Sequence, residues 1–226
     1  MPRFILVRHG ESVWNGERRI QGHRDPPLSE RGRRQADLVL ARLAPHVGPA
    51  VGAVYTSPLR RAAETAGRIG EVFRLPVIPD PDLREMGLGS WEGMTVPEIQ
   101  AAFPGAYERW LEDPLAAPAP GGEPLPAFAA RTTAAFARMQ AAHPGRDLIV
   151  VSHGGVIKSL LCAVLGLEAR YLFRLKQDNT ALNVVEVGPA VRRVVLLNDT
   201  CHLTLAEDLA ARDVLTDARE PLQPAL

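Results

Sequence analysis

The stretch FILVRHGES, residues 4–12, is a short apolar run that ends abruptly in charged and polar residues. Its branched and aromatic residues, 4–7, predict a buried strand. A cation and an imidazole at the end of a buried strand are costly unless something pairs with Arg8 and His9. Gly10 allows a sharp turn and the close approach of a ligand. Ligands of open α/β sheets bind outside the carboxyl ends of the strands, so this stretch predicts a strand that delivers Arg8 and His9 to a site.

Two further apolar runs end in the same way. DLIVVS, residues 147–152, is followed by His153, and the run 53–56 is followed by a Ser-Pro pair and then by Arg60 and Arg61. A single histidine at a strand end is usually satisfied by local hydrogen bonds. Three such ends in one chain favour a shared site instead.

Length and composition place the chain among ordinary globular proteins. Its 226 residues fit one large domain, which we expect to span residues 1–226. The 26 basic and 26 acidic side chains cancel, so the chain as a whole lacks a basic surface for nucleic acid. The two cysteines, Cys162 and Cys201, fit neither a disulfide framework nor a metal site. We therefore expect no nucleic-acid partner and no metal.

Targeting and membrane signals are also missing from the pattern. The N-terminus lacks a basic region followed by a long apolar run, and no apolar stretch approaches the length of a membrane span. We expect a cytoplasmic protein that does not associate with membranes.

Strands alternate with helices along most of the chain. Helices are predicted from an N-cap at Ser29 to Pro45, from Ser57-Pro58 to Phe73, from Thr95 to about Phe103, over 127–142 and over 156–165. Strands are predicted at the three runs above, at 75–78, and in a hairpin of 181–187 and 191–197 joined through Gly188-Pro189. The tail from Leu203 has weak helical character. This order predicts an α/β fold whose mostly parallel sheet is made mixed by the hairpin.

One segment interrupts the alternation. Residues 79–93 are expected to be irregular, and the Pro- and Gly-rich stretch 117–126 is expected to lack regular structure. The stretch 117–126 is too short to separate two domains, so we expect it to bound an insertion at about 92–126.

Histidines and arginines at one site suit phosphoryl transfer. The planar fork of arginine matches phosphate, and histidine can form a covalent intermediate. His9 would have to be neutral, with one ring nitrogen free and the other held by an acceptor such as a backbone carbonyl near Gly10. Neighbouring guanidinium groups would lower the pKa of His9 and favour that neutral form.

The remaining chemistry is charge compensation and a proton. Arg8, Arg61 and a protonated His153 would balance the phosphoryl charge without a metal. The leaving oxygen needs a carboxylic acid that later acts as a base for water. Glu85 is the preferred candidate, and Glu11 and Glu92 remain rivals on sequence grounds.

Five motifs in order carry a resemblance to a known family. They are RHGESVWNGERRIQGHRDPPLSERG (8–32), SPLRRAAETA (57–66), LREMGLGSWEG (83–93), PGGE (120–123) and VSHGGVIK (151–158). The chain resembles the histidine phosphatase superfamily, the phosphoglycerate-mutase-like enzymes, over roughly residues 3–200. The resemblance implies a three-layer α/β/α fold with a small helical cap.

The resemblance also implies roles for the strand-end residues. His9 falls on the phosphorylated nucleophile and Arg8 on its phosphate-binding neighbour. The phosphate arginine of the second motif falls on Arg61, which leaves Arg60 as a solvated helix residue. Glu85 falls on the proton donor and acceptor, and His153 on the histidine that stabilises the transferring phosphoryl group.

Further positions follow from the same motifs. Asn15 matches a side chain that contacts phosphate, Gln21 and Gly22 match positions that line the substrate pocket, and Gly154 matches a backbone position beside the phosphate. Glu123 would cap the next helix or contact substrate. We expect no catalytic role for the other histidines, which are His23, His46, His143 and His202.

The insertion bears on the branch of the family. Residues 92–126 contain Arg109 as their single basic residue, whereas cofactor-dependent mutases carry additional basic residues there. The aromatic segment 91–111 is expected to form a lid over the leaving group. We therefore favour a phosphatase that needs no cofactor and acts on a small phosphorylated metabolite.

Other readings stay open. The main alternative is a cofactor-dependent phosphoglycerate mutase or a related phosphosugar mutase. A non-catalytic phosphate-binding regulatory module is opposed by the presence of all five central residues. A homodimer is common among relatives, and the hairpin would supply a sheet edge for it.

Overall fold

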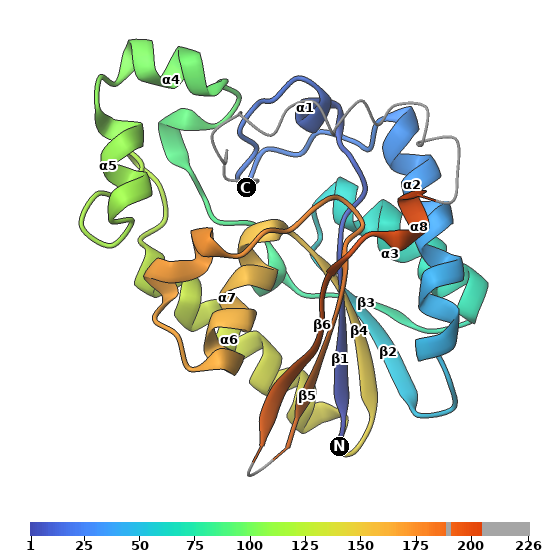
Figure 1. The fold of residues 1–226 in the computed structure, drawn as a ribbon. Helices are drawn as coiled ribbons and strands as arrows, with labels where there is room; N and C mark the ends of the chain where they lie inside the picture. Colours follow the sequence, from blue (N-terminus) through green and yellow to red (C-terminus); the bar gives the residue numbers. More distant parts are fainter. Residues whose placement is uncertain (189–190, 205–226) are drawn as a thin grey trace.

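The computed structural model describes residues 1–188 and 191–204, and within them the chain forms one mixed sheet between helices (Figure 1). The sheet has six strands in the order β3-β2-β4-β1-β5-β6. Strands β1 to β4 pair in parallel, and β5 pairs antiparallel with both of its neighbours, β1 and β6. Their bounds are Arg3–Arg8 (β1), Val51–Thr56 (β2), Val77–Pro79 (β3), Asp147–Ser152 (β4), Leu182–Val187 (β5) and Arg192–Asp199 (β6).

Helices cover both faces of this sheet. The α-helices are Val13–Gly16 (α1), Glu30–Leu43 (α2), Arg60–Phe73 (α3), Val96–Ala102 (α4), Ala106–Glu112 (α5), Leu125–Ala142 (α6), Gly154–Leu165 (α7) and Cys201–Thr204 (α8). Short 3-10 helices lie at Ala44–His46 (η1), Pro81–Leu83 (η2), Gly89–Trp91 (η3) and Ala169–Arg174 (η4). Figure 1 shows α2 and α3 on one side of the strands and α6 and α7 on the other. The predicted α/β class, with a mostly parallel mixed sheet, is confirmed.

Strand β1 illustrates how the sequence builds the two cores. Phe4 and Leu6 belong to the apolar cluster that includes residues of α6 and α7. Ile5 and Val7 belong to the cluster that includes residues of α2 and α3. Because side chains alternate across a strand, a run of four apolar residues is suited to a sheet buried on both faces.

Helix starts were predicted where a polar cap is encoded locally. Ser29 caps α2, and its side chain accepts a hydrogen bond from the Gly32 amide. Thr95 caps α4 through a capping box with Glu98.

Three predicted helix starts differ from the structure, and one of them is that of α7, which begins at Gly154 rather than at Val156. Helix α3 begins at Arg60 after an extended Leu59, so Ser57-Pro58 precede it. Helix α6 begins at Leu125, which places the end of the Pro- and Gly-rich stretch inside its first turn. Proline lacks the amide hydrogen that a first turn leaves unpaired, so Pro126 fits there.

The late hairpin is formed by β5 and β6, and β6 continues to Asp199. Pro189, in its predicted connection, lies outside the described residues, as does the tail from residue 205. In the described part of the chain, no helix has the length and apolar character needed to cross a membrane.

The segment expected to be an insertion contains α4 and α5. Its aromatic side chains face inward: Trp91 and Tyr107 contact Trp110, which also packs on Phe173 of η4. These residues join the same buried cluster as α6 and α7. Their burial gives Trp91, Tyr107 and Trp110 a packing role in this core.

Candidate active site

The three predicted strand ends meet at one edge of the sheet. Arg8 pairs with Ser152 in the parallel register of β1 and β4, which sets His9 beside His153. The His9 amide donates to the Ser152 carbonyl at 2.9 Å, and the Ser57 amide donates to Val151 at 3.2 Å. The imidazole rings of His9 and His153 lie edge to face, with centroids 5.1 Å apart.

His9 is held in one tautomer by its own neighbour. Its Nδ1 lies 2.7 Å from the Gly10 carbonyl oxygen, which can only accept, so Nδ1 carries the hydrogen and Nε2 keeps its lone pair. Burial, with Arg61 and Arg8 nearby, lowers the pKa of His9 well below 6.5. The ring is therefore neutral at physiological pH, as the sequence argument required. Gly10 is needed because a Cβ there would overlap the Gly32 carbonyl.

His153 differs from expectation in its charge. Its side chain is fully buried, and its Nε2 lies 2.8 Å from the Ser57 hydroxyl. Burial, together with Arg61, His9, Arg8 and Arg131, lowers the pKa of His153 well below 6.5, so the protein alone favours the neutral ring rather than the expected cation. The two negative charges of a phosphate ester would raise that pKa.

Two buried arginines flank the histidine pair. Arg61 is 1% exposed and donates to the Arg24 carbonyl at 2.7 Å and to the Gly22 carbonyl at 3.0 Å. Its Nε is buried without a hydrogen-bond partner. Burial lowers the pKa of Arg61 to about 10, which still leaves it charged at neutral pH. Arg8, also buried, donates to the Gln177 carbonyl.

Glu85 reaches the same site from the irregular segment after η2. Its carboxylate is buried and accepts from the Met86 amide at 2.9 Å and from the Gly155 amide at 3.1 Å. The electrostatic field of Glu85 acts on both Arg8 and Arg61. The structure thus brings this carboxylate to the histidine pair.

The two rival carboxylates have other partners. Glu11 accepts from the Ser29 hydroxyl at 2.7 Å and pairs with Arg31. Glu92 accepts from the amides of His23 and Leu88, each at 3.0 Å. Both therefore tie loops together, and Glu85 is the better placed acid.

The remaining predicted residues lie next to this cluster. Asn15 accepts through its side-chain oxygen from the Ser12 amide at 3.0 Å, so its amide group is the donor available to phosphate. Gln21 is buried and accepts from the Ser12 hydroxyl at 2.8 Å. Gly22, with a positive φ of 50°, supplies the carbonyl that orients Arg61. Gly154 is the buried first residue of α7.

Several functional neighbours were not singled out from the sequence. Ser57 orients His153, and Gly155 leaves space for Glu85, because a Cβ there would overlap the carboxylate. Lys158 is buried near Arg8 and Glu85, and burial lowers its pKa to about 8. Lys158 follows Gly155 by three residues on α7, and this spacing places the two residues on the same face of the helix. The sequence pattern could therefore have indicated Lys158 as a neighbour of the site.

Residues 1–188 and 191–204 contain no group of three or more His, Cys, Asp or Glu side chains placed to hold a metal ion.

Comparisons with known proteins agree with this geometry. Residues 4–200 match the family described as the histidine phosphatase superfamily (branch 1). Phosphoserine phosphatase 1 of Hydrogenobacter thermophilus is 35% identical over 203 residues, which cover 90% of this chain and 95% of the relative.

Solved structures share the fold. A mycobacterial glucosyl-3-phosphoglycerate phosphatase in complex with VO3 superposes with a TM-score of 0.80 at 34% identity, covering 88% of this chain and all of that one. A phosphoserine phosphatase mutant of Entamoeba histolytica in complex with phosphoserine gives 0.78 at 25% identity, covering 90% and 100%.

These matches bear out the family suggested by the five sequence motifs. The match to the family spans most of the chain, and the two solved relatives share its fold over 88% and 90% of the chain. The chain belongs to branch 1 of the histidine phosphatase superfamily and is a phosphatase.

Proposed function

We propose that the protein hydrolyses phosphate monoesters of small metabolites through a phosphohistidine at His9, without a metal cofactor. The observation that carries the proposal is the state of His9: a neutral ring, its Nδ1–H fixed on Gly10, beside two buried arginines. That arrangement leaves Nε2 as a nucleophile in a field suited to an anionic substrate.

The first half-reaction transfers the phosphoryl group. Nε2 of His9 attacks phosphorus, the ester P–O bond breaks, and the leaving oxygen takes a proton from Glu85. Arg8, Arg61 and the Asn15 amide hold the phosphoryl oxygens, and His153 faces the same group. Positioning and charge compensation supply most of the catalysis in such transfers.

The second half-reaction restores the enzyme. Glu85, now ionised, takes a proton from water as the water oxygen attacks phosphorus. The P–N bond to His9 breaks and inorganic phosphate leaves. Gln21, Gly22 and Gly154 border the site and are proposed to contact the substrate.

The nature of the substrate is proposed from the cap and from the relatives. Arg109, the single basic residue of 92–126, is exposed on α5, and the buried side chains of the cap are aromatic or aliphatic. The cap therefore lacks the cationic lining that a mutase needs to retain a bisphosphate. The relatives named above carry the names of phosphoserine and glucosyl-3-phosphoglycerate phosphatases, which supports a small phosphorylated metabolite.

Phosphate release from a panel of esters tests the proposal. The panel contains phosphoserine, 3-phosphoglycerate, sugar phosphates and p-nitrophenyl phosphate, each with EDTA and with or without 2,3-bisphosphoglycerate. We expect release that neither EDTA nor the primer alters. Isomerisation of 3-phosphoglycerate that depends on the primer, without release, would establish a mutase instead.

The His9→Ala variant tests the intermediate. With a ³²P-labelled ester, the wild type is expected to show acid-labile label on the protein, and His9→Ala is expected to lose both label and at least about 10³-fold in turnover. Retained turnover would remove His9 from the mechanism. Arg60→Ala changes an exposed residue in the first turn of α3, serves as the control and is expected to keep full activity.

A second copy of the chain is the proposed protein partner. Strand β6 forms an edge of the sheet and carries the exposed apolar residues Val195 and Leu197. Unpaired backbone groups at such an edge favour association of two copies. Light scattering at micromolar concentration is expected to give the dimer mass, and a monomer mass would contradict this proposal.

A further inference from the structure

The segment that carries Glu85 has no regular structure to hold it. Residues 84–88 lie between η2 and η3 and belong to neither a helix nor a strand. A general acid must nevertheless be kept within about 0.5 Å of its productive position. The support for Glu85 therefore has to come from elsewhere in the fold.

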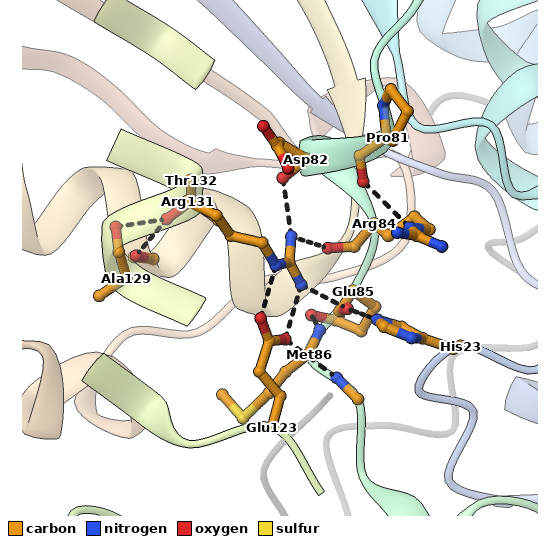
Figure 2. Close-up of polar contacts among 12 residues, drawn as sticks. His23, Pro81, Asp82, Arg84, Glu85, Met86, Glu123, Ala129, Arg131 and Thr132 are labelled. Atoms are coloured by element: carbon orange, nitrogen blue, oxygen red, sulfur yellow. Dashed lines mark hydrogen bonds and ion pairs between the residues drawn. The ribbon is translucent and has the colours of Figure 1, made fainter. Parts of the chain in front are cut away.

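Arg131, on the second turn of α6, supplies most of that support. Its Nη1 donates to the carbonyls of Asp82 and Arg84 at 2.7 and 2.8 Å, and its Nη2 donates to the Glu85 carbonyl at 2.9 Å. Figure 2 shows the guanidinium group between these carbonyls and the carboxylate of Glu123. The Arg131 side chain thus holds the peptide groups before and after the Cα atom of Glu85.

Glu123 completes the support from the opposite side. Its carboxylate binds Arg131 in bidentate fashion, at 2.6 Å to Nε and 2.8 Å to Nη2, and both side chains are 18% exposed. The same carboxylate accepts from the Gly87 amide at 3.3 Å, and the Glu123 amide donates to the Gly87 carbonyl at 2.7 Å. Glu123 therefore neither caps α6 nor lies free for substrate, which answers the question left open by the sequence.

A second contact acts on the same carbonyl. The Glu85 oxygen also lies 2.8 Å from Nε2 of His23, whose backbone amide donates to Glu92. The Glu85 carbonyl is thereby held by two donors, Arg131 from α6 and His23 from a loop. With the backbone fixed in this way, the side chain of Glu85 is aimed at the Gly155 amide beside His153.

We propose that Arg131 and Glu123 form a positioning pair that holds Glu85 in place as the general acid and base. The inference rests on the proposed hydrolytic function and goes beyond it, since both side chains act through the backbone of the segment that carries Glu85. The pairing also neutralises Arg131, so the support adds little net charge beside the acid. Lysine cannot replace Arg131, because three rotating donors cannot reproduce the five hydrogen bonds of the planar fork.

The test compares Arg131→Lys with the wild type on phosphoserine, a poor leaving group, and p-nitrophenyl phosphate, a good one. We expect kcat/KM, which reports the first phosphoryl transfer, to fall about 10²-fold on phosphoserine and less than about threefold on p-nitrophenyl phosphate, because in that step only the poor leaving group depends on a well-placed proton donor. In a Glu85→Gln background, Arg131→Lys is expected to cause no further loss, since the group that it positions is gone.

Two other variants separate positioning from general support of the fold. Arg138→Lys changes an exposed arginine on the same helix, 53% exposed and paired with Asp80 and Asp82, and is expected to leave both rates unchanged. Glu123→Gln keeps the shape of the carboxylate and is expected to reproduce the leaving-group effect more weakly. It also provides the same readout if Arg131→Lys does not fold.

The outcomes distinguish this inference from the function on which it rests. Equal losses on both esters, or a further loss in the Glu85→Gln background, would make Arg131 a purely structural residue and overturn the inference alone. A wild type that releases no phosphate from any ester would overturn the proposed function, and the positioning role with it.

Discussion

At the scale of single residues, the site depends on histidines that are kept neutral. Burial lowers the pKa of His9, His46, His153 and His202, and that of His202 falls to about 4. In His9 this has a chemical use, because a protonated ring has no lone pair with which to attack. The same burial that prepares the nucleophile makes the folded state resist protonation.

Stability is therefore expected to fall as the solution becomes acidic. In the unfolded chain these histidines take up protons below about pH 6.5, whereas the folded chain does not, so acid favours unfolding. The contribution of these neutral histidines to the free energy of unfolding is complete above pH 6.5. It is lost progressively below that pH, for His202 down to about pH 4. The fully buried His9 and His153 each contribute up to about 1.4 kcal/mol per pH unit within their window.

Urea unfolding at pH 7.5, 6.5 and 5.5 measures this slope. The His202→Gln variant, in which the amide can keep the contact that His202 Nε2 makes with the Thr180 hydroxyl, is expected to show a smaller slope than the wild type. A free energy of unfolding that is unchanged between pH 7.5 and 5.5 would contradict the prediction.

At the scale of elements, the first turn of α7 packs tightly against the segment that carries Glu85. Gly155 lies where a Cβ would overlap the Glu85 carboxylate and approach the ring of Phe128. Gly155→Ala is expected to lower kcat about 10²-fold by displacing Glu85, with the fold retained, since alanine is the better helix former.

Gly67 provides a matched control for this substitution. It lies inside α3, and a Cβ there has no neighbour within 4 Å. Gly67→Ala is expected to leave kcat unchanged and to stabilise the fold by about 0.5–1 kcal/mol. Steady-state kinetics and thermal unfolding of both variants check the pair, and equal kcat values would show that Gly155 is not needed to position Glu85.

The elements also show what local sequence can and cannot predict. The end of β1 and the cap at Ser29 are encoded within a few residues, and both were found. The start of α6 was placed too late, because the density of Pro and Gly before it resembles a loop although Pro126 fits a first turn. Arg131 was missed because the backbone carbonyls to which it donates lie 46–49 residues away, and no local pattern marks them.

At the scale of the whole molecule, the cap and the sheet share one core. Trp110 packs between Trp91 of η3 and Phe173 of η4, with ring centroids 5.5 and 4.5 Å away, and these residues continue into the cluster under α6 and α7. We propose on this basis that residues 1–226 form a single cooperative domain rather than a core with a separately folding insertion. A two-state transition is the usual behaviour of such a unit.

The three tryptophans of the chain allow this proposal to be tested directly. In a Trp14→Phe background, the fluorescence comes from Trp91 and Trp110, both at the cap, while far-ultraviolet circular dichroism reports the whole fold. We expect the two urea transitions to coincide. Adding Trp110→Ala is expected to shift both together by about 3–5 kcal/mol, because the substitution opens a cavity in the shared core. If the fluorescence transition comes first, or if Trp110→Ala moves it alone, the cap unfolds independently and the Glu85 segment beside it belongs to the less stable part of the molecule.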